Sequence, residues 1–330
     1  MIIPHSFPSI NNNDYTDLEV LFRESFVGSK VDLNDLIVKK INNFLFAGET
    51  YVTQSGSQGL LIALKNLGVQ ETDKVALCSI NCPSVVNVLK FIGAIPVYYD
   101  VRGTSDFRPS KSDIETVLKE HSPKVVIITH CFGVLVEREI ISYISDNYEI
   151  KVIEDYATSF PSVYSRNIKV GQHSDCVIGS FGSTKPISGG IGGFISLKNS
   201  RFTPEYDVTT DENDKITFNI NISSINQRLI LNQLNRIDSI LFKRKKIVEF
   251  YTKYLNIWQH SCDLFRAITF EDTGDLAKDL RSIGCELDVR SCLHPYVSSS
   301  DMENALNFNS YLSLPLNIKM YEYLVENKLL

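Results

Sequence analysis

Residues 74–100 read KVALCSINCPSVVNVLKFIGAIPVYYD. Two short apolar runs, 74–78 and 95–100, flank a stretch at 83–93 in which apolar residues recur at helical spacing. The pattern predicts a strand, a helix and a second strand, with apolar side chains on both faces of each strand. Such strands are typical of a parallel sheet that helices cover on both sides.

The same alternation extends on both sides of this unit, from about residue 50 to residue 197. Further strands are predicted at 124–129, 151–155, 175–181 and 192–197. Further helices are predicted at 56–68, 111–121 and 136–146. Alternating strands and helices predict an α/β domain of three layers with a mostly parallel central sheet.

The composition changes after residue 200. Residues 201–217 are polar and predict a loop, and one long helix is predicted from about 223 to 254. The remainder mixes short elements. We therefore predict a large domain at 1–200, which includes an N-terminal arm, and a smaller C-terminal α/β domain at 201–330.

Composition excludes several classes of protein. The 330 residues carry a net charge of −6, so the chain has no general attraction for nucleic acid or anionic membranes, and neither is expected as a partner. No apolar run approaches the roughly 20 residues of a membrane span, and the first residues lack the pattern of a signal peptide. Seven cysteines without a CxxC pair are typical of reduced thiols in a cytoplasmic protein.

The strongest local feature is GSFGSTKPISGGIGGF at 179–194. Lys185 precedes the glycines, unlike the order in a P-loop, and no helix follows directly, unlike a dinucleotide-binding fingerprint. Lys185 is therefore either a surface lysine before a turn or an amine nucleophile in a desolvated setting.

Two other segments carry groups suited to a ligand. Asp155 ends the strand at 151–155, so its carboxylate is expected at the edge of the sheet where α/β proteins bind ligands, although it would also suit a turn cap. Ser55, Gly56 and Ser57 precede a helix rich in Ala and Leu. They form either an ordinary N-cap or an anion site.

A zinc site is the weaker interpretation of four other residues. Cys78 and Cys82, with His130 and Cys131, could ligate zinc, but the CxxxC spacing is not that of a zinc finger. Cys78 ends an apolar strand, which favours buried thiols, and no metal is expected. His130 fits a supporting role beside the site and a purely structural role equally well.

In their order along the chain, these segments resemble the DegT/DnrJ/EryC1/StrS family. SGSQGLLIAL at 55–64 is similar to the family's phosphate-binding segment, VIEDYATSF at 152–160 to its acidic strand end, and SFGSTKPISGGIGG at 180–193 to its lysine loop. Further similar segments lie at 93–101, 129–133, 219–240 and 311–316. The family consists of sugar aminotransferases that use pyridoxal phosphate and have the aspartate-aminotransferase-like architecture, fold type I.

The resemblance implies a role for individual residues. Lys185 and Asp155 would be catalytic: Lys185 would bind pyridoxal phosphate covalently and shuttle a proton, and Asp155 would pair with the pyridine nitrogen. Ser55, Gly56 and Ser57 would hold the phosphate.

Two further residues would complete the phosphate site. Ser180 would add a hydroxyl. Asn219 would reach the phosphate from the neighbouring subunit, which implies a homodimer with shared active sites.

Five residues depart from the family pattern. Cys82 stands where an aromatic residue stacks on the cofactor, and Thr158 replaces the Gln or His beside it. Both are still expected to line the cofactor site. Pro186, Ile191 and Asn221 replace Asn, Glu and Arg.

The resemblance therefore implies an enzyme that moves an amino group from glutamate to a keto-sugar, expected to be nucleotide-linked, and the cysteine pattern implies a cytoplasmic location. Two alternatives stay open: a pyridoxal-phosphate-dependent sugar dehydratase, and a catalytically lapsed relative with a binding or regulatory role. The dehydrating branch has His in place of the lysine, so Lys185 argues against it. The joint presence of Lys185, Asp155 and the phosphate segment argues against the lapsed relative.

Overall fold

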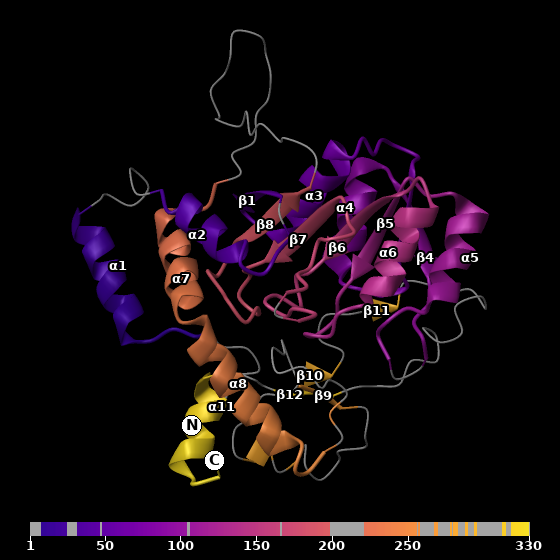
Figure 1. Ribbon diagram of the computed structural model, residues 1–330. Helices are drawn as coiled ribbons and strands as arrows, with labels where there is room; N and C mark the ends of the chain where they lie inside the picture. Colours follow the sequence, from indigo (N-terminus) through magenta and orange to yellow (C-terminus); the bar gives the residue numbers. More distant parts are fainter. Residues whose placement is uncertain are drawn as a thin grey trace.

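A computed structural model describes most of the chain (Figure 1). The described residues are 8–24, 32–46, 48–103, 106–165, 167–198, 221–255, 257, 267–269, 278, 280–282, 288–289, 294–295, 312–314 and 318–329. The predicted loop at 201–217 and Asn219 lie outside them.

The central element is a seven-stranded sheet with the order β1-β8-β7-β6-β5-β2-β4 (Figure 1). Its strands are β1 (Glu49–Thr53), β2 (Lys74–Cys78), β4 (Ile95–Tyr99), β5 (Val125–Thr129), β6 (Lys151–Asp155), β7 (Cys176–Ser180) and β8 (Gly193–Leu197). Pairing is parallel from β4 through β7, whereas β8 runs antiparallel to both β7 and β1. The mostly parallel sheet and its six predicted strands are confirmed, and β1 is an addition.

Helices cover both faces of this sheet. They are α3 (Gly56–Asn66), α4 (Pro83–Ile92), α5 (Lys111–His121) and α6 (Arg138–Asn147). Successive residues of a strand point to opposite faces. Val75 and Leu77 accordingly pack in one cluster with α3 and α4, and Ala76 and Cys78 pack in another with α5 and α6. The three layers predicted from the sequence are confirmed.

A third cluster joins α2 (Asn34–Ile41) and α7 (Ser224–Asn235) to the end of the sheet near β8. The single long helix predicted from 223 to 254 is wrong, because α7 ends before Arg236 and α8 (Ile237–Tyr251) starts after it. Arg236 has φ −116° and ψ 27°, outside the helical region. Its guanidinium binds residues of the N-terminal segment. These partners are distant in the sequence, so the residues around Arg236 do not predict the break.

A second, smaller sheet lies in the C-terminal part of the chain. Strands β10 (Asp288–Val289), β12 (Leu312–Leu314) and β9 (Ala267–Thr269) form a small antiparallel sheet, and α8 packs with α11 (Ile318–Glu326). The division at residues 200 and 201 stays a prediction, and α7 packs with the large sheet. None of the described helices has both the length and the hydropathy that a membrane crossing requires.

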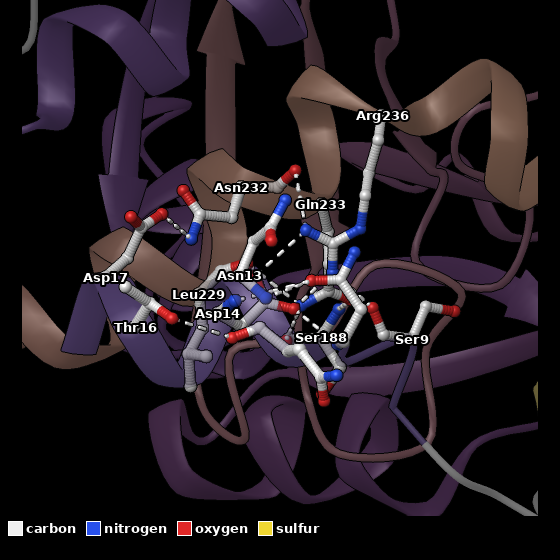
Figure 2. Close-up of polar contacts among 12 residues, drawn as sticks. Ser9, Asn13, Asp14, Thr16, Asp17, Ser188, Leu229, Asn232, Gln233 and Arg236 are labelled. Carbon is white, nitrogen blue, oxygen red and sulfur yellow. Dashed lines mark hydrogen bonds and ion pairs between the residues drawn. The ribbon is translucent and has the colours of Figure 1, made fainter. Parts of the chain in front are cut away.

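Helix α1 (Asn12–Glu24) is fixed to α7 by a buried ion pair (Figure 2). Asp14 is fully buried, and both of its carboxylate oxygens accept hydrogen bonds from the guanidinium of Arg236, one at 2.9 Å. Arg236 also donates to the Ser9 carbonyl at 2.6 Å. The N-terminal segment is therefore anchored at the point where α7 gives way to α8.

We predict that Asp14→Ala destabilises the protein by about 2–3 kcal/mol, because it leaves the largely buried Arg236 guanidinium without its carboxylate. Glu19→Ala on the same helix is the matched control. It breaks only an exposed pair with Arg23 and should cost less than about 0.5 kcal/mol. Urea unfolding measures both free energies, and equal losses would show that the buried pair has no special weight.

Candidate active site

The predicted site residues come together in one pocket at the carboxyl edge of the parallel strands. The pocket has a volume of about 160 Å³. Eight of the nine predicted residues line it: Ser55, Gly56, Ser57, Cys82, Asp155, Thr158, Ser180 and Lys185. The ninth, Asn219, lies outside the described residues. Segments more than a hundred residues apart in sequence therefore share one cavity.

Asp155 ends β6 and is 5% exposed. Its Oδ1 accepts a hydrogen bond from the Ala157 N–H at 3.0 Å, and within the described part of the chain it forms no ion pair. Burial raises the pKa of Asp155, while the Ala157 N–H and the charge of Lys185 lower it in part. A buried carboxylate of this kind is stabilised by a cation placed in the pocket.

Ser55 is the N-cap of α3. Its hydroxyl oxygen accepts a hydrogen bond from the Gln58 N–H at 3.1 Å, and the first intrahelical bond joins the Gly59 N–H to the Ser55 carbonyl at 3.0 Å. The N–H groups of Gly56 and Ser57 precede that bond, so they can bind an anion in the pocket. The two sequence interpretations, N-cap and anion site, are compatible.

The start of α3 lies directly against β8. A Cβ at Gly193 would come within 2.5 Å of the Ser55 carbonyl carbon and 2.6 Å of the Gly56 nitrogen. No side chain fits there, which explains the glycine at 193. Because Gly193 pairs with Ser180, the end of β7 lies on the same wall of the pocket.

Lys185 follows β7 in a tight turn. Its backbone N–H donates to the Gly182 carbonyl at 3.0 Å, and its side chain lines the pocket with Asp155. Ser180, the last residue of β7, accepts the Gly182 N–H at 3.2 Å. The strand end and the turn thus place an amine on the wall that faces the buried carboxylate.

Cys82 and Thr158, two of the departures from the family pattern, both line this pocket. The Cys82 thiol lies 3.1 Å from the Ser84 hydroxyl at the start of α4. The Thr158 hydroxyl donates to the His130 carbonyl at 2.7 Å and accepts the Phe132 N–H at 3.3 Å. Thr158 is therefore engaged with backbone, and Cys82 is engaged with a neighbouring hydroxyl.

Three further polar residues line the pocket and were not predicted from the sequence: Asn81, Ser84 and Thr129. The Asn81 amide donates to the Thr129 hydroxyl at 3.1 Å, and its carbonyl accepts the Cys82 N–H at 2.8 Å. Thr129 ends β5 directly opposite Asp155. Thr129 ends a parallel strand, as Asp155 does, so the same signal in the sequence marks both residues.

His130 has a structural role on the other face of the sheet. Its Nδ1 accepts the Val136 N–H at 3.0 Å, so its Nε2 carries the proton and donates to Glu154 at 2.9 Å. Burial raises the pKa of the Cys78 thiol to about 12, as expected for an unreactive core cysteine. No group of three or more His, Cys, Asp or Glu side chains within the described ranges could hold a metal ion.

The pocket fits pyridoxal phosphate by the chemistry of its donors. The cofactor carries an anionic phosphate, a ring nitrogen that can hold a positive charge and an aldehyde that reacts with amines. The start of α3, the Asp155 carboxylate and the Lys185 amine match these three groups in turn, and all of them line one cavity.

Comparison with known proteins agrees with this chemistry. A GDP-perosamine synthase of Vibrio cholerae is 24% identical over 345 aligned positions, covering 98% of this chain and 89% of the relative. A UDP-4-amino-4,6-dideoxy-N-acetyl-beta-L-altrosamine transaminase of Campylobacter jejuni is 22% identical, covering 76% of this chain and 69% of the relative.

The fold is also that of solved aminotransferases. A Helicobacter pylori aminotransferase involved in the biosynthesis of pseudoaminic acid superposes with a TM-score of 0.80 at 18% identity, covering 100% of this chain and 98% of the other. The model of the DegT/DnrJ/EryC1/StrS aminotransferase family matches residues 19–263. The chain therefore belongs to this family, whose members are pyridoxal-phosphate-dependent sugar aminotransferases.

Proposed function

We propose that the protein transfers an amino group from glutamate to the keto group of a nucleotide-linked sugar, as a cytoplasmic homodimer. The observation that carries this proposal is the single pocket that joins the Lys185 amine, the Asp155 carboxylate and the start of α3. The names of the two relatives, one a GDP-sugar enzyme and one a UDP-sugar enzyme, support a nucleotide-linked substrate.

Bound pyridoxal phosphate supplies an electron sink for the carbon that carries the transferred nitrogen. Asp155 would hold the ring nitrogen in its charged form. A charge pair about 4 Å apart is worth about 4 kcal/mol at an effective dielectric constant near 20, or about 3 pKa units. The same pairing would relieve the cost of burying the Asp155 carboxylate.

The other groups of the pocket bind the cofactor and move protons. The N–H groups of Gly56 and Ser57 would bind the phosphate, with hydroxyls from Ser55 and Ser180 nearby. The Nζ atom of Lys185 would accept a proton from the substrate carbon and return it to the neighbouring position, which requires a neutral amine.

Two features support a cytoplasmic homodimer. Large apolar side chains are exposed on the isolated chain, among them Tyr15 at 63%, Phe22 at 55% and Ile191 at 52%, and a second subunit would cover such side chains. Free thiols such as Cys82 suit a reducing compartment.

The two alternatives have less support. The dehydrating branch of the family replaces the lysine with His, and this chain keeps Lys185 in the pocket. A lapsed relative would not be expected to keep the amine, the buried carboxylate and the anion-binding helix start together. The aminotransferase is therefore the function that the site supports best.

The first prediction from the proposed function concerns the covalent attachment of the cofactor. The purified protein supplied with pyridoxal phosphate should absorb visible light, and borohydride should fix the cofactor to Lys185. Glutamate should remove the visible band, and a GDP- or UDP-linked keto-sugar should restore it. Lys185→Ala should abolish the borohydride-stable product, whereas Lys169→Ala, a control outside the pocket, should not. A protein that stays colourless and is unchanged by glutamate would contradict the proposed function.

The second prediction concerns Asp155→Asn and has two opposite effects. With cofactor, the rate of the glutamate half-reaction should fall about a thousandfold, from the loss of about 4 kcal/mol of charge pairing. Without cofactor, the variant should be more stable than wild type at pH 7, by about 1 kcal/mol, because a buried charge is removed. Stopped-flow absorbance and thermal unfolding measure the two effects.

The sign of the pH dependence provides a check. Because the folded-state pKa of Asp155 is raised above its value of 3.8 in the unfolded chain, the wild-type carboxyl destabilises the cofactor-free fold above the folded pKa. This cost disappears as the pH falls toward 3.8, so the advantage of Asp155→Asn should shrink in that window. An advantage that does not depend on pH, or a similar one in the exposed control Asp146→Asn, would show that Asp155 has been misassigned.

The third prediction concerns the shared active site. If Asn219 reaches the phosphate of the partner, each site combines Lys185 of one chain with Asn219 of the other. In a mixed dimer of Lys185→Ala and Asn219→Ala chains, one site carries both changes and the other carries neither. Activity after subunit exchange should exceed the summed activities of the two variants and approach half of wild type per mixed dimer.

This experiment needs two controls: Asn219→Ala alone must be impaired, and exchange must be demonstrated with differently tagged chains. Exchange without any gain in activity would show that Asn219 acts within its own chain.

A further inference from the structure

The loop that carries Lys185 is held by the side-chain amides of α7. Gln233 is fully buried, and its Oε1 accepts the Ser188 N–H at 3.1 Å while its Nε2 donates to the Ser188 carbonyl at 2.6 Å (Figure 2). One side chain therefore binds both backbone groups of a residue three positions after Lys185. Asn226 donates to the Gly189 carbonyl at 2.6 Å.

The contact between the loop and α7 is also tightly packed. Asn226, Ile230 and Gln233 are spaced by four and three residues, so they share one face of the helix. A Cβ at Gly189 would lie 2.8 Å from the Ile230 side chain. The loop therefore has little freedom to shift along α7 while these contacts are intact.

Two backbone hydrogen bonds within the lysine loop join residues on either side of Lys185 and close the turn before it. The Gly189 N–H donates to the Phe181 carbonyl at 3.0 Å, and the Lys185 N–H donates to the Gly182 carbonyl at 3.0 Å. Ser188 lies three residues after Lys185 in this closed loop, so a displacement of Ser188 is expected to move Lys185. The position of the Lys185 amine thus depends on the hydrogen bonds between α7 and Ser188.

Helix α7 is itself fixed on the far side. Arg236, three residues after Gln233, forms the ion pair with Asp14 of α1 (Figure 2). Asn232 of α7 also donates to Asp17 of α1 at 2.7 Å. Contacts with α1 therefore hold the end of α7 that binds the loop.

We propose that Gln233 is a positioning residue that holds Lys185 toward Asp155 by binding both backbone groups of Ser188, with Asn226 as a second point of attachment. The inference rests on the proposed role of Lys185. Loss of Gln233 leaves the buried N–H and carbonyl of Ser188 without their partner, which favours a shifted loop over the productive one. The amine then samples positions from which it meets the cofactor less often.

Gln227 offers a matched control on the same helix. It is also buried, and its Oε1 accepts the Leu33 N–H at 2.8 Å, so it binds the start of α2 and not the lysine loop. Gln233→Met and Gln227→Met each remove the hydrogen bonds of a buried amide while keeping a side chain of similar length. Any general loss of stability should therefore be similar in the two variants.

The experiment measures how fast cofactor-free protein forms the covalent linkage with added pyridoxal phosphate, followed by visible absorbance and borohydride trapping. Gln233→Met should slow this step at least tenfold and shift the pH midpoint of the visible band, while Gln227→Met stays within twofold of wild type. In the cofactor-free proteins, peptides covering 182–192 should exchange deuterium about tenfold faster in Gln233→Met alone.

Equal behaviour of the two variants, or an unchanged linkage rate in Gln233→Met, would overturn the inference while the proposed function stands. If wild type itself forms no linkage, the proposed function fails and this inference fails with it. Should Gln233→Met not fold, the comparison of Asn226→Ala with Gln227→Met decides. The first must slow linkage at least threefold relative to the second, or the inference is wrong.

Discussion

Parallel pairing of β2, β5, β6 and β7 brings the ends of these strands to one edge of the sheet. In this register Thr129 lies opposite Asp155, and Asp155 opposite Ile178, so polar side chains at strand ends face a common space. The antiparallel β8 then returns past the start of α3, where Gly193 permits contact. The whole pocket depends on this arrangement, because its amine, carboxylate and anion-binding groups come from three separate crossings of the chain.

Two neighbouring carboxylates on β6 are both buried but differ in the number of hydrogen bonds that they accept. Glu154 points to the α5 and α6 side, where it accepts hydrogen bonds from His130, Gly171 and Ser174. Its charge is therefore satisfied within the fold. Asp155 points to the opposite face and accepts one N–H within the described chain, and burial raises its pKa. A carboxylate left with so little compensation is typical of a site that binds a positive group.

The sequence predicts the elements whose signal is local. Six strands of the large sheet follow from apolar runs, and Asp155 follows from its place at a strand end. β1 does not, because ETYVT mixes polar and apolar residues. The break at Arg236 coincides with its ion pair to Asp14, 222 positions earlier, while the helical pattern runs on unchanged. The contact of Gln233 with Ser188 spans 45 positions and is likewise invisible to any local pattern.

The five residues that depart from the family pattern differ in whether they line the pocket and in what their side chains contact. Pro186, Ile191 and Asn221 are not among the residues that line the pocket in the described chain, and Ile191 is half exposed. Thr158 lines it, but its hydroxyl binds backbone groups of 130 and 132. Cys82 is different, since its thiol lies beside the Ser84 hydroxyl at the start of α4 and the residue stands on the pocket wall. The residues proposed to anchor the cofactor are therefore distinct from all five of these positions, of which Cys82 and Thr158 line the same pocket.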